Sequence, residues 1–204
     1  MSETRGSARG GRLWRAAALV AAGLVVAGYA ITVNPAEGAT EGTGENSAFS
    51  EAGIERIEQE RAATIDLRGP LTADDLGAGG SAPRDVDVRG EEPIQLTALG
   101  AEGDLVVDAE VIRVLVGAGG EVQSIALFEG PQDAAALADR LLAVGPQVGL
   151  DGAALQSVMQ SLGGGESVDH WLHGGQSLGF TVGLHPVHDP ADGSVLEYQL
   201  TPPS

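Results

Sequence analysis

The chain of 204 residues contains no cysteine and no lysine, and only 3% of its residues are aromatic. Without cysteine there are no disulfide bonds to hold the chain together. There is also no thiol that a lipid could acylate, so the protein is not a lipoprotein. Every basic residue is an arginine. The stability of a folded domain in this chain must therefore come from an apolar core or from a ligand.

Charge is distributed unevenly along the chain. Beyond Asn34 there are 28 acidic residues against seven arginines, and from Pro93 onward there are 14 against two. Such a surface repels the phosphates of nucleic acid and anionic lipid headgroups, so we expect no nucleic-acid partner. It attracts cations or a basic protein, but the same charge also serves solubility or adaptation to a salty exterior. The sequence leaves these two interpretations open.

The N-terminus has the pattern of a membrane anchor. Four arginines lie within residues 1–15, and the following residues 16–33 carry no charge. Eighteen helical residues rise roughly 27 Å, close to the hydrocarbon thickness of a bilayer. Clustered arginines stay on the cytoplasmic side. We therefore predict a short basic cytoplasmic tail at 1–15 and a single transmembrane helix at 16–33, with the rest of the chain outside the cytoplasm.

A cleaved secretory signal peptide is the alternative to a retained anchor. It has the same order of charged and apolar segments, but its apolar core is shorter, about 7–15 residues. Cleavage would release the protein from the membrane as a secreted form. Both interpretations place the body of the chain outside the cytoplasm.

Composition divides the remainder of the chain into three parts. Residues 34–50 are rich in glycine, threonine and glutamate and predict a flexible linker. Residues 51–90 form an acidic juxtamembrane segment, partly helical or disordered, in which Ile54 and Ile57 share one helical face. The sequence leaves open whether this segment packs on the domain. Denser apolar patterning marks residues 91–204 as one small extracytoplasmic α+β domain.

The periodicity of this domain predicts the order β-β-β-α-α-β-β. A mainly antiparallel sheet with two helices on one face buries these apolar stripes most simply, behind the transmembrane helix and flexible linker. We expect strands at 94–98, 105–116, 121–128, 178–184 and 196–200, a helix opening at Pro131 and stopping at 145–146, and a second helix from an N-cap at Asp151 to Gly163.

Two further expectations concern packing. Gly179, Thr181 and Gly183 leave one strand face almost bare of side chains, which favours a helix packed very close to it over a ligand or partner backbone. Trp171 is expected at the edge of the core.

Three short motifs resemble functional sites, but their context predicts structural roles. Gly175–Gly179 has the G-x-S-x-G pattern around Ser177, yet it lacks the strand-turn-helix context that exposes a catalytic serine. Gly117–Gly120 lies between two strands and predicts a hairpin turn rather than a phosphate-binding loop. Asp189 and Asp192 could hold calcium, but carboxylates at a hairpin tip more often cap their own backbone.

The four histidines form the strongest candidate site. They occur as two His-x-x-His pairs, His170/His173 and His185/His188, with three aspartates close in sequence. Imidazole and carboxylate groups are suitable ligands for a divalent metal, zinc first. However, this spacing brings two histidines to one side only in a helix or turn, and neither segment is clearly helical. The alternative is that these are solvated loop histidines and that no cofactor is bound.

These observations favour a single-pass, membrane-anchored extracytoplasmic binding or scaffold module of a bacterial cell envelope, with no catalysis and with an envelope protein as partner. The bacterial assignment follows from the bias toward alanine, glycine and arginine. The first alternative is a metal-binding envelope protein or hydrolase that uses the histidine cluster. The second is a sensory ectodomain, although the short tail leaves no cytoplasmic domain to receive a signal.

Overall fold

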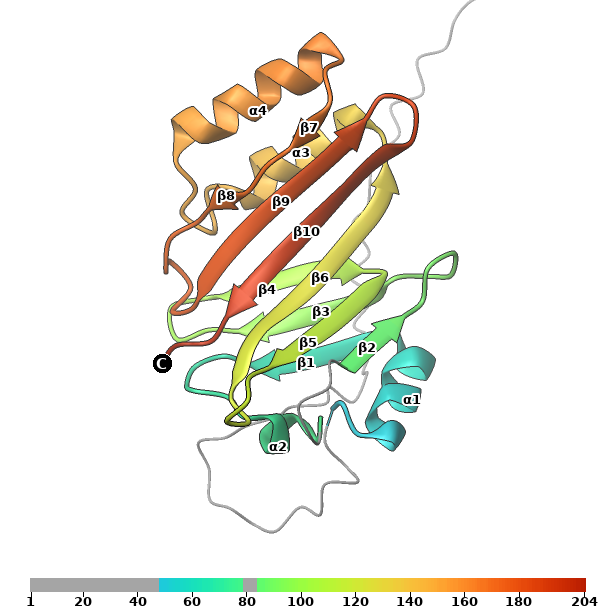
Figure 1. Cartoon of the computed structure of the whole chain (residues 1–204), viewed down its shortest axis with the longest axis vertical. Coiled ribbons are helices and arrows are strands. Elements are labelled where there is room, and N and C mark those ends of the chain that lie inside the picture. Colours follow the sequence, from blue (N-terminus) through green and yellow to red (C-terminus); the bar gives the residue numbers. More distant parts are fainter. Residues whose placement is uncertain (1–47, 79–83) are drawn as a thin grey trace, which may run out of the picture.

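The computed structural model describes residues 48–78 and 84–204, which form a mixed α+β domain dominated by antiparallel sheet (Figure 1). The predicted cytoplasmic tail and membrane helix, and all but the end of the predicted linker, lie outside these described residues. Within them, no helix combines the length and apolar character that crossing a membrane requires.

The strands form two sheets. The smaller sheet has the order β1-β3-β4, with β1 parallel to β3, and the larger, seven-stranded sheet has the order β2-β5-β6-β10-β9-β7, with β8 also paired to β9. The helices are α1 (Glu51–Glu60), α2 (Ala73–Leu76), α3 (Ala134–Val144) and α4 (Gly152–Gly164). The strands are β1 (Ala62–Asp66), β2 (Arg84–Asp87), β3 (Ile94–Leu99), β4 (Asp104–Ala109), β5 (Val111–Val116), β6 (Val122–Gln132), β7 (Val168–Asp169), β8 (Leu172–His173), β9 (Thr181–Asp189) and β10 (Gly193–Thr201).

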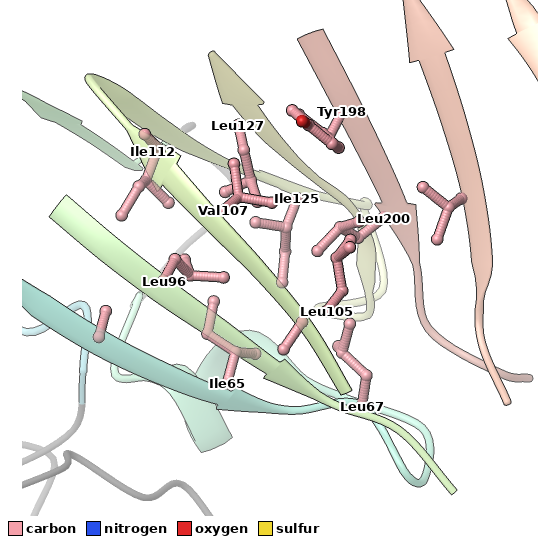
Figure 2. Close-up of a cluster of buried hydrophobic side chains, with 14 of the residues drawn as sticks. Ile65, Leu67, Leu96, Leu105, Val107, Ile112, Ile125, Leu127, Tyr198 and Leu200 are labelled. Atoms are coloured by element: carbon pink, nitrogen blue, oxygen red, sulfur yellow. The ribbon is translucent and has the colours of Figure 1, made fainter. Parts of the chain in front are cut away.

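The core lies between the two sheets, which pack face to face (Figure 2). Ile65 and Leu96 of the smaller sheet lie opposite Ile125 and Leu200 of the larger one, and all four are fully buried. Burying each side chain of this size contributes about 1.5–3 kcal/mol. In a chain without disulfides, this interface is the main source of stability.

Residues 51–90, whose place the sequence left open, contribute elements to both sheets. The α1 helix begins after the N-cap Ser50, whose hydroxyl accepts from the Gly53 N–H, and buries Ile57. The β1 strand then pairs with β3, and β2 pairs with β5. The folded domain therefore begins well before residue 91.

The prediction of a single strand at 105–116 is wrong, because the chain changes sheets at Glu110. Before that residue the odd positions Val107 and Ala109 are buried, whereas after it the even positions Ile112 and Val114 are buried. In a straight strand, all odd-numbered residues lie on one face and all even-numbered residues on the other. The shift in parity turns the chain from β4, in the smaller sheet, into β5, in the larger one.

Helices α3 and α4 follow the predicted order and lie on one side of the larger sheet, with Leu137 and Leu141 of α3 buried. Their N-caps are Asp133 and Asp151, whose carboxylates accept from the backbone of the first turn. Helix α3 starts later than predicted because β6 runs on to residue 132. Strand β9 passes in front of α3 in Figure 1.

A charged cluster links α3 to both sheets. Arg140 Nε of α3 donates to Glu129 Oε2 of β6 at 2.9 Å and to the Tyr198 hydroxyl of β10 at 2.8 Å. The Tyr198 hydroxyl itself donates to Glu129 Oε2 at 2.6 Å. The Arg140 Nη2 reaches the Val106 carbonyl of β4 at 3.2 Å. Burial and the neighbouring Glu129 raise the pKa of Tyr198, so it stays a hydrogen-bond donor at all ordinary pH values.

We predict that Arg140→Met lowers the free energy of unfolding by about 2–3 kcal/mol, because it leaves the Glu129 carboxylate partly buried without its cation. Urea unfolding followed by circular dichroism measures this loss. The matched control is Arg113→Met, which removes an arginine from an exposed pair with Asp85. The control should change stability by less than about 1 kcal/mol. Equal losses in the two variants would contradict a special role for the Arg140 cluster.

A second ion pair lies at the C-terminal end of β1, between Asp66 and Arg68. The Asp66 side chain is only 1% exposed, and its Oδ1 accepts from Arg68 Nε at 2.9 Å and from the Arg68 backbone N–H at 3.0 Å. The Arg68 hydrogen bonds lower the pKa of Asp66 despite its burial. The folded state therefore favours the charged carboxylate.

We predict that Asp66→Asn destabilises the protein by about 1–2 kcal/mol at neutral pH and much less in acid. A carboxyl with a lowered pKa stabilises the fold above its unfolded-state pKa, about 3.9, and this stability is lost as the pH falls through the folded-state pKa. The stability difference between the two proteins should be constant above about pH 5 and shrink below about pH 4. A difference that does not depend on pH would show that the Asp66 charge contributes nothing.

Candidate functional site

The face of the seven-stranded sheet that points away from the core is not covered by any described helix (Figure 1). Strict alternation along β10 buries Leu196 and Tyr198 and turns Glu197 outward between them. We call this uncovered surface the outer face. Its principal side chains belong to Asp85, Val111, Arg113, Phe128, Trp171, His185, Val195, Glu197 and Gln199.

One end of the outer face contains a hollow of about 370 Å³. Arg113 forms a forked pair with Asp85, with nitrogen–oxygen distances of 2.9 and 2.7 Å. Arg89 pairs with Asp87 at 3.0 Å and lowers the pKa of that carboxyl to about 2. The hollow thus combines apolar side chains with arginines from two exposed ion pairs, an arrangement suited to an amphipathic group. It is lined by Asp87, Arg89, Glu110, Val111, Arg113, Phe128, Gly130 and Val195.

The other end of the outer face carries Trp171. Its indole lies over Gly183, whose missing Cβ would sit 3.5 Å from the ring, and stacks on His185 with centroids 4.5 Å apart and planes 18° apart. The imidazole Nε2 is 2.8 Å from Asp169 Oδ1, and its Nδ1 is 3.2 Å from Glu197 Oε2. An aromatic ring, an imidazole and two carboxylates therefore lie side by side. They come from the β7–β8 connection, β9, β7 and β10.

This geometry corrects two expectations from the sequence. Trp171 is 37% exposed on the outer face rather than placed at the core edge. The bare face at Gly183 is covered by the Trp171 indole and not by a helix. At Gly179 the close neighbour is the backbone of Ala101, only 2.9 Å from where a Cβ would lie.

The structure separates the four histidines proposed as metal ligands. His170 and His173 are exposed, His185 lies on the outer face, and His188 is buried on the opposite face with its Nδ1 2.8 Å from Ser194 Oγ. Residues three apart on a strand point to opposite faces, which explains the separation of the second pair. In the part of the chain that the structure describes, no three histidine or carboxylate side chains gather as a metal site requires. The zinc hypothesis stays a prediction.

The three short motifs occupy turns and loops. The Ser177 hydroxyl donates to the Gln147 carbonyl at 2.6 Å and so holds its loop against the end of α3. Gly117 and Glu121 close the β5–β6 hairpin, as predicted. Asp189 Oδ1 accepts from the Ala191 N–H at 2.8 Å, which confirms the predicted backbone cap at a hairpin tip.

The sequence pattern singled out His185 but not its partners. Asp169 and Glu197 reach it from β7 and β10, and the register of those strands is set by pairing between distant segments. The alternation of Leu196, Tyr198 and Leu200 could have identified Glu197 as an outward-pointing residue of the candidate site.

No family model matches the chain, and neither a curated protein nor a solved structure matches it. What can be said of its function therefore depends on the outer face itself.

We predict that Gly183→Ile displaces the Trp171 ring and shifts its fluorescence emission to longer wavelength, while stability changes by less than about 1 kcal/mol. The measurement uses a Trp14→Phe background, in which Trp171 is the only tryptophan. Gly183→Ala is the matched control, because its Cβ would make only ordinary contact with the ring. Unchanged emission in the isoleucine variant would contradict the stacked arrangement.

Proposed function

We propose that this protein is a membrane-anchored, extracytoplasmic binding module of a bacterial cell envelope, and that its outer face binds a protein partner. The observation that carries the proposal is the asymmetry of the larger sheet. Its inner face is covered by α3, α4 and the smaller sheet, whereas its outer face presents Trp171, Val195 and the hollow to solvent. Exposed aromatic and aliphatic groups among polar ones are typical of interaction surfaces.

Two serines, Ser177 and Ser194, bear on whether the described residues include an activated nucleophile. An activated serine needs both a general base and access to its substrate. Within 48–78 and 84–204, Ser194 lies within hydrogen-bond distance of the His188 imidazole, but both residues are buried on the core side, out of reach of a substrate. Ser177 is exposed, but its hydroxyl donates to the Gln147 backbone carbonyl rather than to a base. Each serine therefore meets one requirement and not the other.

The predicted anchor supplies the location in this proposal. Residues 16–33 would hold the chain in the membrane, and residues 34–50 would tether the domain outside it. In the alternative, cleavage at the signal peptide would release the same binding module as a secreted protein.

Site-specific photo-crosslinking in cells that naturally make the protein tests this function. We predict that a benzoylphenylalanine at Val195, on the outer face, forms a discrete adduct with one protein partner. The matched control is the same substitution at Val106, a valine of similar exposure on β4 of the smaller sheet, 46% against 36%. The control should form no such adduct, because it lies on a different surface.

The proposal fails if Val195 yields no adduct in a correctly localised, folded protein. It also fails if Val195 and Val106 yield the same set of adducts, because capture would then not depend on the outer face.

A further inference from the structure

The described part of the chain has a large surplus of negative charge. It contains 25 acidic residues and seven arginines. Five of those arginines are paired with one carboxylate each, which leaves about 20 acidic groups outside these pairs. A partner of complementary charge is therefore basic. The five pairs are Arg61–Glu91, Arg68–Asp66, Arg89–Asp87, Arg113–Asp85 and Arg140–Glu129.

Trp171 offers a cation an aromatic surface on the outer face. One side of its ring lies against Gly183 and His185, yet more than a third of the residue remains exposed. The face of an indole attracts a cation through its quadrupole, more strongly than the ring of phenylalanine or tyrosine. Because Gly183 has no side chain, the indole approaches the sheet backbone there, and 37% of the Trp171 residue stays exposed to solvent.

Asp169 supplies a negative charge beside the imidazole on which that ring stacks. Its side chain is 77% exposed, and its Oδ1 contacts His185. Glu197, on the other side of the imidazole, is less exposed. Asp169 is therefore the carboxylate available to an incoming cation.

The Trp171 end of the outer face is continuous with the hollow. Asp169 lies opposite Val187 on β9, and Val187 lies opposite Val195 on β10. Val195 in turn lines the hollow. An extended segment crossing these strands would meet a carboxylate and an indole first and an apolar depression next.

We propose that the outer face binds an arginine side chain of a basic polypeptide partner, with the guanidinium stacked on Trp171 beside Asp169. A planar guanidinium suits both a ring face and a carboxylate. An aliphatic residue next to that arginine would occupy the hollow. This inference depends on the proposed binding function and names the chemistry of its partner.

The test uses the full chain with Trp14→Phe in a non-ionic detergent, so that Trp171 fluorescence reports binding. The probe is a blocked hexapeptide with one arginine followed by valine. Its control is the same peptide with citrulline, which has nearly the same shape and no charge. We expect saturable binding of the arginine peptide and about tenfold weaker binding of the citrulline peptide.

Two charge variants separate a specific site from general attraction. Asp169→Asn should weaken binding of the arginine peptide about fivefold, whereas Asp192→Asn, which removes the same charge from the β9–β10 turn, should weaken it by less than about twofold. Trp171→Leu, followed by calorimetry, should abolish measurable binding while circular dichroism confirms the fold. Equal effects of the two aspartate variants, or equal affinities for the two peptides, would overturn the inference.

The outcomes also distinguish this inference from the proposed function. A specific adduct at Val195 without preference for arginine over citrulline would support the proposed binding module and contradict the arginine site. Arginine binding at Trp171 without an adduct at Val195 would support the cation site and remove the protein partner proposed for the outer face.

Discussion

The placement of α3 against the two sheets depends on the cluster of Arg140, Glu129 and Tyr198. It is the place where α3, the larger sheet and β4 of the smaller sheet meet through hydrogen bonds to one guanidinium. A half-buried carboxylate is costly unless a cation and further donors satisfy it, and here both come from different elements. The cluster therefore favours the arrangement in which helix and small sheet share one side of the larger sheet.

That arrangement determines where a binding surface can lie. Because the helices and the smaller sheet occupy the inner face, the strands β9 and β10 leave their outward side chains partly or fully exposed. Alternation along β9 then separates His188, which is buried beside Ser194, from His185, which supports Trp171. A single strand thus contributes one histidine to stability and another to the candidate site.

The sequence predicted the features that depend on local pattern. It did not predict the features that depend on pairing between distant segments of the chain. The α+β class, both long helices and the β5–β6 turn follow from periodicity, caps and glycine placement. The break at Glu110 was not predicted, although Asp108 and Arg113 could not both point outward from one straight strand. The partners of His185 could not be predicted from the sequence, because the register between distant strands brings Asp169 and Glu197 next to it.

The excess of acidic side chains bears on which partners the domain can select. A domain with so large an excess of carboxylates attracts any cation at long range, and salt screens that attraction. Close contact is what discriminates, and on the outer face the contact surface is small. It consists of one indole, which stacks on His185 and contacts Gly183, and of the well-exposed carboxylate of Asp169 that contacts the same imidazole. Long-range charge would then govern the rate of encounter, while Trp171 and Asp169 would govern which cationic group remains bound.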